Sequence, residues 1–173
     1  MNKLLLLDLD GTVRETASGA TFINDPFDQK LIAGAAEAIA KYKAQGWCVT
    51  GISNQGGVEA GFKTIGSCLE EQRHTLRLLS HTMNCIYICP GIGEMCWEVS
   101  TSGGEVFQRQ DGEPGFRKPE PGMIQLAIAR TTDSLEESVS ECLYVGDREE
   151  DMLAAKAADV RFQWAHIWRG DRP

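Results

Sequence analysis

The feature that most constrains the fold lies in the first dozen residues, where Leu4–Leu7 lead directly into Asp8-Leu9-Asp10-Gly11-Thr12. A short apolar run that ends at a glycine turn predicts a strand buried on both faces, as in a parallel sheet. Alternation along the strand places Asp8 and Asp10 on the same side. Two carboxylates there are costly unless they hold a cation or move protons. The alternative, a solvated acidic turn after an edge strand, fits four leucines poorly.

The rest of the chain alternates between short apolar segments and helical patterns. Further strands are predicted at 47–52, 85–89, 142–145 and 160–168, and helices at 28–45, 65–83, 121–131 and 152–158. This order predicts an α/β fold, a doubly wound parallel sheet of five strands with right-handed crossovers. We expect a single domain over residues 1–173.

Three connecting segments carry more specific expectations. The polar stretch Val13–Gln29 is too short for a separate cap domain and predicts a minimal cap. The Gly-rich loop Pro90–Phe116 has the length at which loops tend to be functional, and short apolar stretches at 97–99 and 105–107 suggest a small hairpin within it. Ser134 and Glu137 have the spacing of a capping box.

The 173-residue chain carries a formal net charge of −8, which favours solubility and disfavours undirected binding to nucleic acid or anionic membranes. Its apolar runs are all shorter than the roughly 18 residues that a membrane-spanning helix needs. Because the first strand begins at once, we expect no signal peptide and a cytoplasmic location. The six cysteines are then expected to be reduced thiols.

Polar side chains stand at the ends or starts of four elements: Asp8 and Asp10, Ser53, Lys118, and Asp147 and Asp151. Because the carboxyl ends of the strands in a doubly wound sheet converge on one crevice, we expect these groups to meet. Carboxylate oxygens suit Mg²⁺, while a hydroxyl and an ammonium group suit the oxygens of a phosphoryl group. The absence of histidine and cysteine from these positions argues against catalytic zinc.

These four segments resemble, in order, the four motifs of the haloacid dehalogenase (HAD) superfamily of phosphohydrolases. The segments are Asp8-Leu9-Asp10-Gly11-Thr12, Ser53-Asn54-Gln55, Lys118-Pro119 and Gly146-Asp147-Arg148-Glu149-Glu150-Asp151. The resemblance spans nearly the whole chain. Its finer pattern is similar to the minimal-cap group of histidinol-phosphate phosphatases, D,D-heptose-1,7-bisphosphate phosphatases and polynucleotide 3′-phosphatases.

The resemblance implies a Mg²⁺-dependent phosphomonoesterase in which Asp8 is the nucleophile and forms an aspartyl-phosphate intermediate. It makes Asp10 the acid that protonates the leaving oxygen and then the base that deprotonates water. The implied metal ligands are the Asp8 carboxylate, the Asp10 backbone carbonyl and Asp147, with Asp151 acting directly or through water.

The same resemblance assigns the remaining site residues. Ser53 and Lys118 would hold the phosphoryl oxygens, and Lys118 would also neutralise charge beside Asp8. The candidate substrate-binding residues are Thr12, Asn54 and Arg117.

The chain departs from the zinc-containing relatives in the loop that precedes Arg117. Gly91 stands where those relatives have histidine, and Pro114 and Phe116 stand where they have cysteine, so we expect no structural zinc. An arginine that is usual in the heptose enzymes is replaced around Glu59-Ala60, which disfavours a bisphosphate sugar substrate.

Three functions remain open at this point. The first is hydrolysis of a small phosphorylated metabolite. The second is removal of 3′-phosphates from nucleic acid ends, for which the loop Pro90–Phe116 and its neighbours could supply a basic, aromatic track. The residues of that track would be Trp97, Phe107, Arg109, Phe116 and Arg117. The third is a phosphate-binding regulatory module without activity. We expect the loop Pro90–Phe116 to select the substrate.

Overall fold

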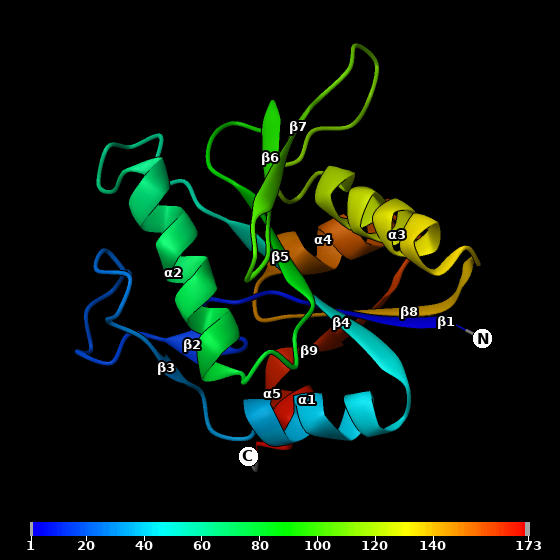
Figure 1. The fold of residues 1–173 in the computed structure, drawn as a ribbon, viewed down its shortest axis with the longest axis horizontal. Coiled ribbons are helices and arrows are strands. Elements are labelled where there is room, and N and C mark those ends of the chain that lie inside the picture. The colour runs from blue at the N-terminus through cyan, green and yellow to red at the C-terminus, as the bar shows by residue number, and fades with distance from the viewer. Residues whose placement is uncertain (1, 172–173) are drawn as a thin grey trace.

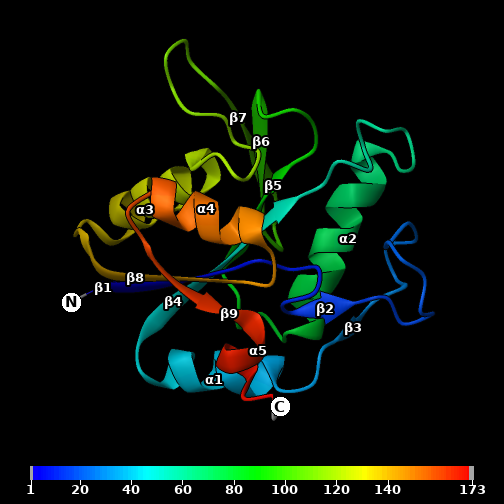
Figure 2. The ribbon, with the colours of Figure 1, turned by 180° about the vertical axis from the view of Figure 1, so that it is seen from behind.

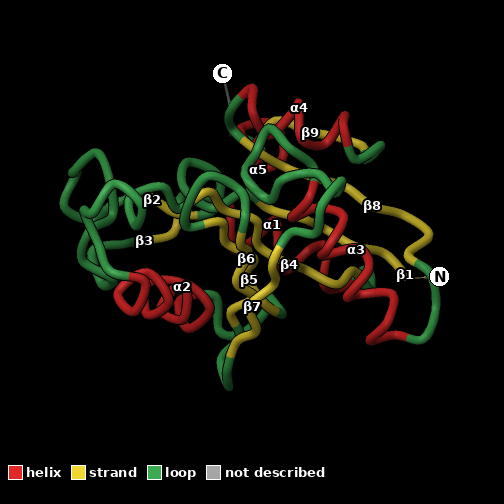
Figure 3. The backbone as a smooth tube through the Cα atoms, turned by 90° about the horizontal axis from the view of Figure 1, so that it is seen from above, coloured by secondary structure: helices red, strands yellow, loops and turns green. Residues whose placement is uncertain are grey.

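The computed structural model describes residues 2–171, and its centre is one sheet of seven strands in the order β7-β6-β5-β4-β1-β8-β9 (Figures 1 and 3). The strands are β1 (Asn2–Leu7), β4 (Trp47–Asn54), β5 (Cys85–Cys89), β6 (Met95–Val99), β7 (Gly104–Gln108), β8 (Val139–Gly146) and β9 (Arg161–Trp164). Five of them, β5-β4-β1-β8-β9, are parallel, which confirms the predicted five-stranded core. The hairpin β6–β7 adds two antiparallel strands beyond β5.

Helices cover both faces of the sheet (Figures 1 and 2). One face packs against α1 (Ala35–Ala44), α2 (Ile65–Leu78) and α5 (Ala165–Arg169), and the other against α3 (Gly122–Leu135) and α4 (Glu149–Ala157). The leucines of β1 alternate between these two cores. Leu5 and Leu7 join the first core, Leu4 and Leu6 join the second, and all four are fully buried. A central strand with two covered faces therefore explains the unbroken leucine run.

The first helix begins later than predicted. Lys30–Leu31 (β3) pair with Arg14–Glu15 (β2) in a small antiparallel ribbon, so the helical pattern assigned from residue 28 starts only at Ala35. This ribbon carries the loop 16–29, which is the minimal cap. The pairing partner lies in a distant turn, so the local pattern could not reveal it.

Other boundaries also differ from the prediction. α2 ends at Leu78 rather than at residue 83, and α3 continues to Leu135 rather than stopping at 131. Because Ser134 lies inside α3, the predicted capping box with Glu137 is wrong. The predicted strand 160–168 is divided into the short strand β9 and the helix α5.

Within residues 2–171, none of the helices combines the length and the apolar character that a membrane span requires.

Candidate active site

Asp8 follows the last residue of β1 and lies in the interior of the site. Its backbone N–H donates to the carbonyl of Val145 in β8, so the sheet fixes its position. Its carboxylate accepts hydrogen bonds from Lys118 Nζ at 2.7 Å and from Thr12 Oγ1 at 3.0 Å. Asp8 is only 6% exposed, and Lys118 only 3%. The side chain predicted to be the nucleophile is therefore held by two fixed donors.

Lys118 also joins Asp8 to the start of α4. Its Nζ donates to Asp151 Oδ1 at 2.7 Å and to the Tyr144 hydroxyl at 3.2 Å, and that hydroxyl donates to the same Asp151 oxygen. Burial alone would lower the pKa of Lys118, but the adjoining Asp8, Tyr144 and Asp151 raise it well above its ordinary value. Lys118 is therefore a permanent cation at the centre of the site.

Asp147 completes a group of three carboxylates with Asp8 and Asp151. One oxygen from each lies within 4.8 Å of the others, a spacing that a single cation can bridge. Asp147 directly follows β8, and Asp151 lies in the first turn of α4. Gly11, at a φ of 93°, leaves space for the Asp147 carboxylate, which a Cβ at this position would strike. We call Asp8, Lys118, Asp147 and Asp151 the Asp8 cluster.

The Asp8 cluster has three carboxylates and one ammonium group, so two formal negative charges are left uncompensated. Burial, with the Asp151 and Asp147 carboxylates, raises the pKa of Asp8 to about 7, although Lys118 acts in the opposite direction. Partial burial and Asp151 likewise raise the pKa of Asp147. A divalent cation would compensate this charge, and three hard oxygen ligands suit Mg²⁺.

The other predicted site residues lie around this cluster, in different settings. Ser53 lies at the end of β4, with Oγ 3.5 Å from Asp10 Oδ2. The Asn54 amide exchanges two hydrogen bonds of 3.0 Å with the backbone of Lys118, so it holds that segment in place. Thr12 is fully buried beneath Asp8 rather than in the cleft, whereas Arg117 lines the cleft and donates to the carbonyl of Gly91.

Asp10 belongs to a second group of charges. Its carboxylate accepts hydrogen bonds from Arg14 Nε at 2.9 Å, Arg14 Nη2 at 3.3 Å and Gln55 Nε2 at 3.1 Å. Arg14 is fully buried and also donates to Glu71 Oε1 at 2.6 Å. Although burial opposes it, the Arg14 guanidinium lowers the pKa of Asp10 below its ordinary value. Asp10 is thus held by side chains from β2 and from the turn after β4.

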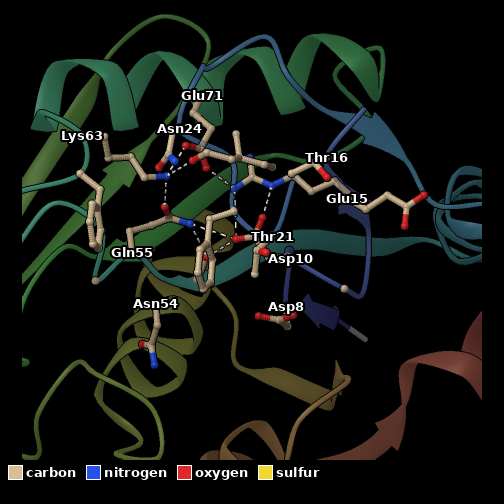
Figure 4. Close-up of a pocket in the computed structure, with 18 of the residues that line it drawn as sticks. Asp8, Asp10, Glu15, Thr16, Thr21, Asn24, Asn54, Gln55, Lys63 and Glu71 are labelled. Atoms are coloured by element: carbon tan, nitrogen blue, oxygen red, sulfur yellow. Dashed lines mark hydrogen bonds and ion pairs between the residues drawn. The ribbon is translucent and has the colours of Figure 1, made fainter. Parts of the chain in front are cut away.

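Lys63 closes this second group. Its ammonium group pairs with Glu71 Oε2 and donates to Gln55 Oε1 at 3.0 Å and to the backbone carbonyl of Ile23 at 2.8 Å. Figure 4 shows Lys63, Glu71 and Gln55 grouped on the side of Asp10 that is away from Asp8. We call Asp10, Arg14, Gln55, Lys63 and Glu71 the Asp10 network. Its two carboxylates are matched by two cations.

Arg14, Lys63 and Glu71 were not predicted from the sequence to belong to the site, and Gln55 was assigned no role there. Glu71 could have been noticed in the sequence, because it is a carboxylate on the same face of α2 as the buried residues Cys68 and Leu76. Arg14 lies four residues after Asp10, close enough to have been considered as its partner. The contact between Arg14 and Glu71 joins residues 57 positions apart, which no local pattern predicts.

A cleft of about 790 Å³ opens above both groups. It is lined by residues of the segments 14–24 and 53–63, together with Arg117, Lys118 and residues at the start of α4. Phe22 and Phe62 stand at this cleft with about two thirds or more of their surface exposed.

None of the described residues of the loop Pro90–Phe116 lines the cleft, although the Gly91 carbonyl accepts a hydrogen bond from Arg117, so the part of this loop in selecting the substrate stays a prediction. Phe116 is buried, and Phe107 packs on the second core and beneath Arg130. Trp97 packs on the first core. Arg109 pairs instead with Glu94, and of the five expected track residues only Arg117 reaches the cleft. Most of the loop is used to build the hairpin β6–β7.

Comparison with known families decides the classification. Residues 3–165 match the family model described as polynucleotide kinase 3 phosphatase. The chain belongs to this family. The expected relation to HAD phosphatases is thereby confirmed, and the protein is a phosphoric monoester hydrolase of this type.

Curated relatives of similar length carry a more specific name. The chain is 29% identical over 168 residues to the D-glycero-beta-D-manno-heptose-1,7-bisphosphate 7-phosphatase of Pasteurella multocida, covering 93% of this chain and 79% of that protein. It is 28% identical over 162 residues to the enzyme of the same name from Escherichia coli, covering 90% and 74%.

Solved structures share the fold. The D,D-heptose 1,7-bisphosphate phosphatase from B. bronchiseptica, solved with magnesium and phosphate, superposes with a TM-score of 0.66 at 24% identity, over 92% of this chain and 78% of that one. The corresponding protein from Burkholderia thailandensis gives a TM-score of 0.53 at 19% identity, over 92% and 76%. These likenesses confirm the α/β architecture.

Proposed function

We propose that the protein hydrolyses a small phosphorylated sugar with the help of Mg²⁺, through an aspartyl-phosphate intermediate on Asp8. The observation that carries this proposal is the Asp8 cluster, in which three carboxylates share one buried ammonium group. Asp8, Asp147 and Asp151 would hold the cation, together with the backbone carbonyl of Asp10. Bound there, Mg²⁺ would offset the charge of the phosphoryl group and of the Asp8 nucleophile.

In the first half of the reaction, an Asp8 oxygen attacks phosphorus, and the bond from phosphorus to the substrate oxygen breaks. Asp10 gives its proton to that leaving oxygen. The negative charge of a bound phosphate favours the protonated form of Asp10, against the influence of Arg14. Lys118 balances the charge on Asp8 and the phosphoryl group, while Thr12 keeps the Asp8 carboxylate in place.

In the second half, Asp10 accepts a proton from water, and the water oxygen attacks phosphorus. The bond to Asp8 breaks, inorganic phosphate leaves, and Asp10 is again protonated for the next substrate. Ser53 and Arg117 are proposed to contact the substrate, and Asn54 to hold Lys118 in position. General acid–base catalysis of this kind contributes roughly 10²–10⁴-fold to the rate.

Two observations support a small sugar phosphate as the substrate. The curated relatives named above are heptose bisphosphate phosphatases, and a cleft of about 790 Å³ has the size of small-molecule sites. Ala60 lines this cleft beside the exposed Glu59, so residues 59–60 offer no cation for a second phosphate, although Lys30, Arg117 and Arg148 line other parts of the cleft. A monophosphate is therefore the preferred form.

The second candidate substrate is a nucleic acid 3′ end, which the description of the matched family favours. The net charge of −8 and the packing of Trp97, Phe107 and Phe116 away from the cleft weigh against it. The phosphate-binding module without activity has the weakest support, since the matched family and the curated relatives above are phosphatases.

The test is a phosphate-release screen with Mg²⁺ that covers sugar monophosphates, heptose bisphosphate, histidinol phosphate, nucleotides and a 3′-phosphorylated oligonucleotide. We expect the highest kcat/KM for a sugar monophosphate, and no turnover by the Asp8→Asn variant. A higher kcat/KM for the oligonucleotide than for the sugar monophosphates would indicate that the substrate is a nucleic acid 3′ end. Equal phosphate release by wild type and Asp8→Asn would contradict the proposed chemistry.

A further inference from the structure

The Asp10 network places two buried cations and a buried carboxylate directly beside the proposed proton donor Asp10. Arg14 is fully buried, yet two of its nitrogens face Asp10 and one of these also faces Glu71. The remaining Arg14 nitrogen contacts Thr75 and Gln29, so every edge of the guanidinium is occupied. Because the planar guanidinium is hydrogen-bonded on all sides, its two donors to Asp10 have a fixed position and direction.

Gln55 fixes Asp10 from another direction. Its Nε2 donates to Asp10 Oδ2 and to Ser53 Oγ, while its Oε1 accepts from Lys63. Because Oε1 is occupied by an ammonium group, the amide has one orientation, with its NH₂ toward Asp10. The Asp10 carboxylate is therefore restrained on both oxygens, although its side chain remains 41% exposed to the cleft.

Glu71 lets the two cations lie close together. One oxygen accepts from Arg14 and the other pairs with Lys63, and Glu71 itself is only 1% exposed. Removing such a carboxylate from between two buried cations would leave them to repel each other. Figure 4 shows Glu71 and Lys63 on the same side of Asp10.

We propose that Arg14 and Glu71 are positioning residues that fix the Asp10 carboxylate in the orientation needed to protonate the leaving oxygen. The inference rests on the proposed function, because it concerns the proton that Asp10 delivers in that reaction. It predicts that variants that no longer fix the Asp10 carboxylate have a lower kcat/KM for substrates whose leaving group needs a proton. The kcat/KM for substrates whose leaving group needs no proton should change little. A network that only stabilised the fold would affect both kinds of substrate alike.

The test compares two aryl phosphates. Phenyl phosphate releases a basic phenolate that needs protonation, whereas 2,4-dinitrophenyl phosphate releases a stable anion that does not. The measured quantity is kcat/KM, because it reports the steps up to transfer of phosphorus to Asp8. The variants are Arg14→Lys, which keeps the charge but loses the fork, and Glu71→Gln, which keeps the shape.

The matched controls are Arg77→Lys and Glu70→Gln, because Arg77 and Glu70 form an exposed ion pair of 2.6 Å on the same helix as Glu71. Asp10→Asn is the reference for complete loss of the proton donor. Thermal unfolding checks that each variant is folded at the assay temperature.

We expect Arg14→Lys and Glu71→Gln to lower kcat/KM for phenyl phosphate by about 10²-fold, as small misplacements of a catalytic group do. The value for 2,4-dinitrophenyl phosphate should fall less than about threefold, and Asp10→Asn should show the same selectivity more strongly. The two controls should match wild type on both substrates.

Equal losses on both substrates, or no loss on phenyl phosphate, would overturn the inference while leaving the proposed function in place. If Arg14→Lys does not fold, Glu71→Gln carries the test, and failure of both to fold would make the network structural and overturn the inference. Wild type that releases phosphate from neither aryl phosphate and from no substrate of the phosphate-release screen would instead contradict the proposed function.

Discussion

The Asp8 cluster and the Asp10 network share one cleft but differ in how their charges are balanced. The Asp8 cluster sets three carboxylates against one ammonium group, and burial together with the two neighbouring carboxylates raises the pKa of Asp8. The Asp10 network sets two carboxylates against two cations, and its central carboxylate has a lowered pKa. The Asp8 cluster thus has the negative charge to bind a cation, whereas the charges of the Asp10 network are already balanced.

This difference explains how Asp8 and Asp10, the two acids of one short motif, can have different chemical roles. Asp8 and Asp10 are two residues apart, so local sequence gives them nearly the same surroundings. Their partners come from distant elements, Lys118 for Asp8 and Arg14 for Asp10. Those partners, rather than the motif alone, separate a carboxylate that binds metal and phosphorus from one that handles a proton.

The largest expected effect comes from breaking the Asp8 cluster at the nucleophile. Asp8→Asn removes the oxygen that would bond to phosphorus, so kcat should fall by roughly 10⁴-fold or more. Phosphate release at saturating Mg²⁺ measures this. Asp133→Asn, an exposed carboxylate on α3, is the control and should retain full activity. Retention of a tenth of the activity by Asp8→Asn would show that phosphorus does not pass through Asp8.

The next effect concerns the stability of the Asp10 network. Arg14→Gln leaves Asp10 and Glu71 without their shared cation, and breaking one partner of a buried ion pair costs about 3–5 kcal/mol. We expect a fall of this size in the free energy of unfolding, measured with urea. Arg77→Gln breaks an exposed pair and should cost less than about 1 kcal/mol. Similar costs for the two variants would contradict the balanced network.

A smaller effect should appear in the pH dependence of the metal-free protein. The pKa of Asp8 is raised from 3.8 to about 7, so its protonated form stabilises the fold. That contribution is fully present below about pH 4 and is lost as the pH rises through 7. Relative to Asp8→Asn, the wild type should lose on the order of 2–4 kcal/mol of unfolding free energy between these limits. A pH-independent difference would contradict the raised pKa.

The parts of the fold that depend on one segment were predictable. Four leucines can only be buried on alternate faces, so they predicted a central strand, and the turn after it predicted the position of Asp8 and Asp10. The start of α1 was not predictable, because Lys30–Leu31 find their partner across a loop. The same holds for the cleft, whose walls come from the segments 14–24 and 53–63.

In the site too, positions at the ends of elements were predictable, whereas the contacts of the Asp10 network were not. The side chains at the ends or starts of elements along one sheet edge were expected to meet: Asp8, Asp10, Ser53, Lys118, Asp147 and Asp151. The structure joins Asp8, Lys118, Asp147 and Asp151 in one cluster and leaves Ser53 3.5 Å from Asp10, outside it. The Asp10 network depends on a buried arginine reaching a helix 57 residues away. Apart from Asp10, its members were not predicted to have this role from the sequence, and they become partners only through the packing of the fold.

The most direct test of the difference between the two halves is calorimetric titration of Mg²⁺ into wild type, Asp147→Asn and Glu71→Gln. Asp147→Asn removes one carboxylate of the unbalanced cluster and should weaken Mg²⁺ binding by about 10–100-fold. Glu71→Gln removes a carboxylate from the balanced network and should leave the affinity within about threefold of wild type. Equal weakening by both variants, or by neither, would contradict the account.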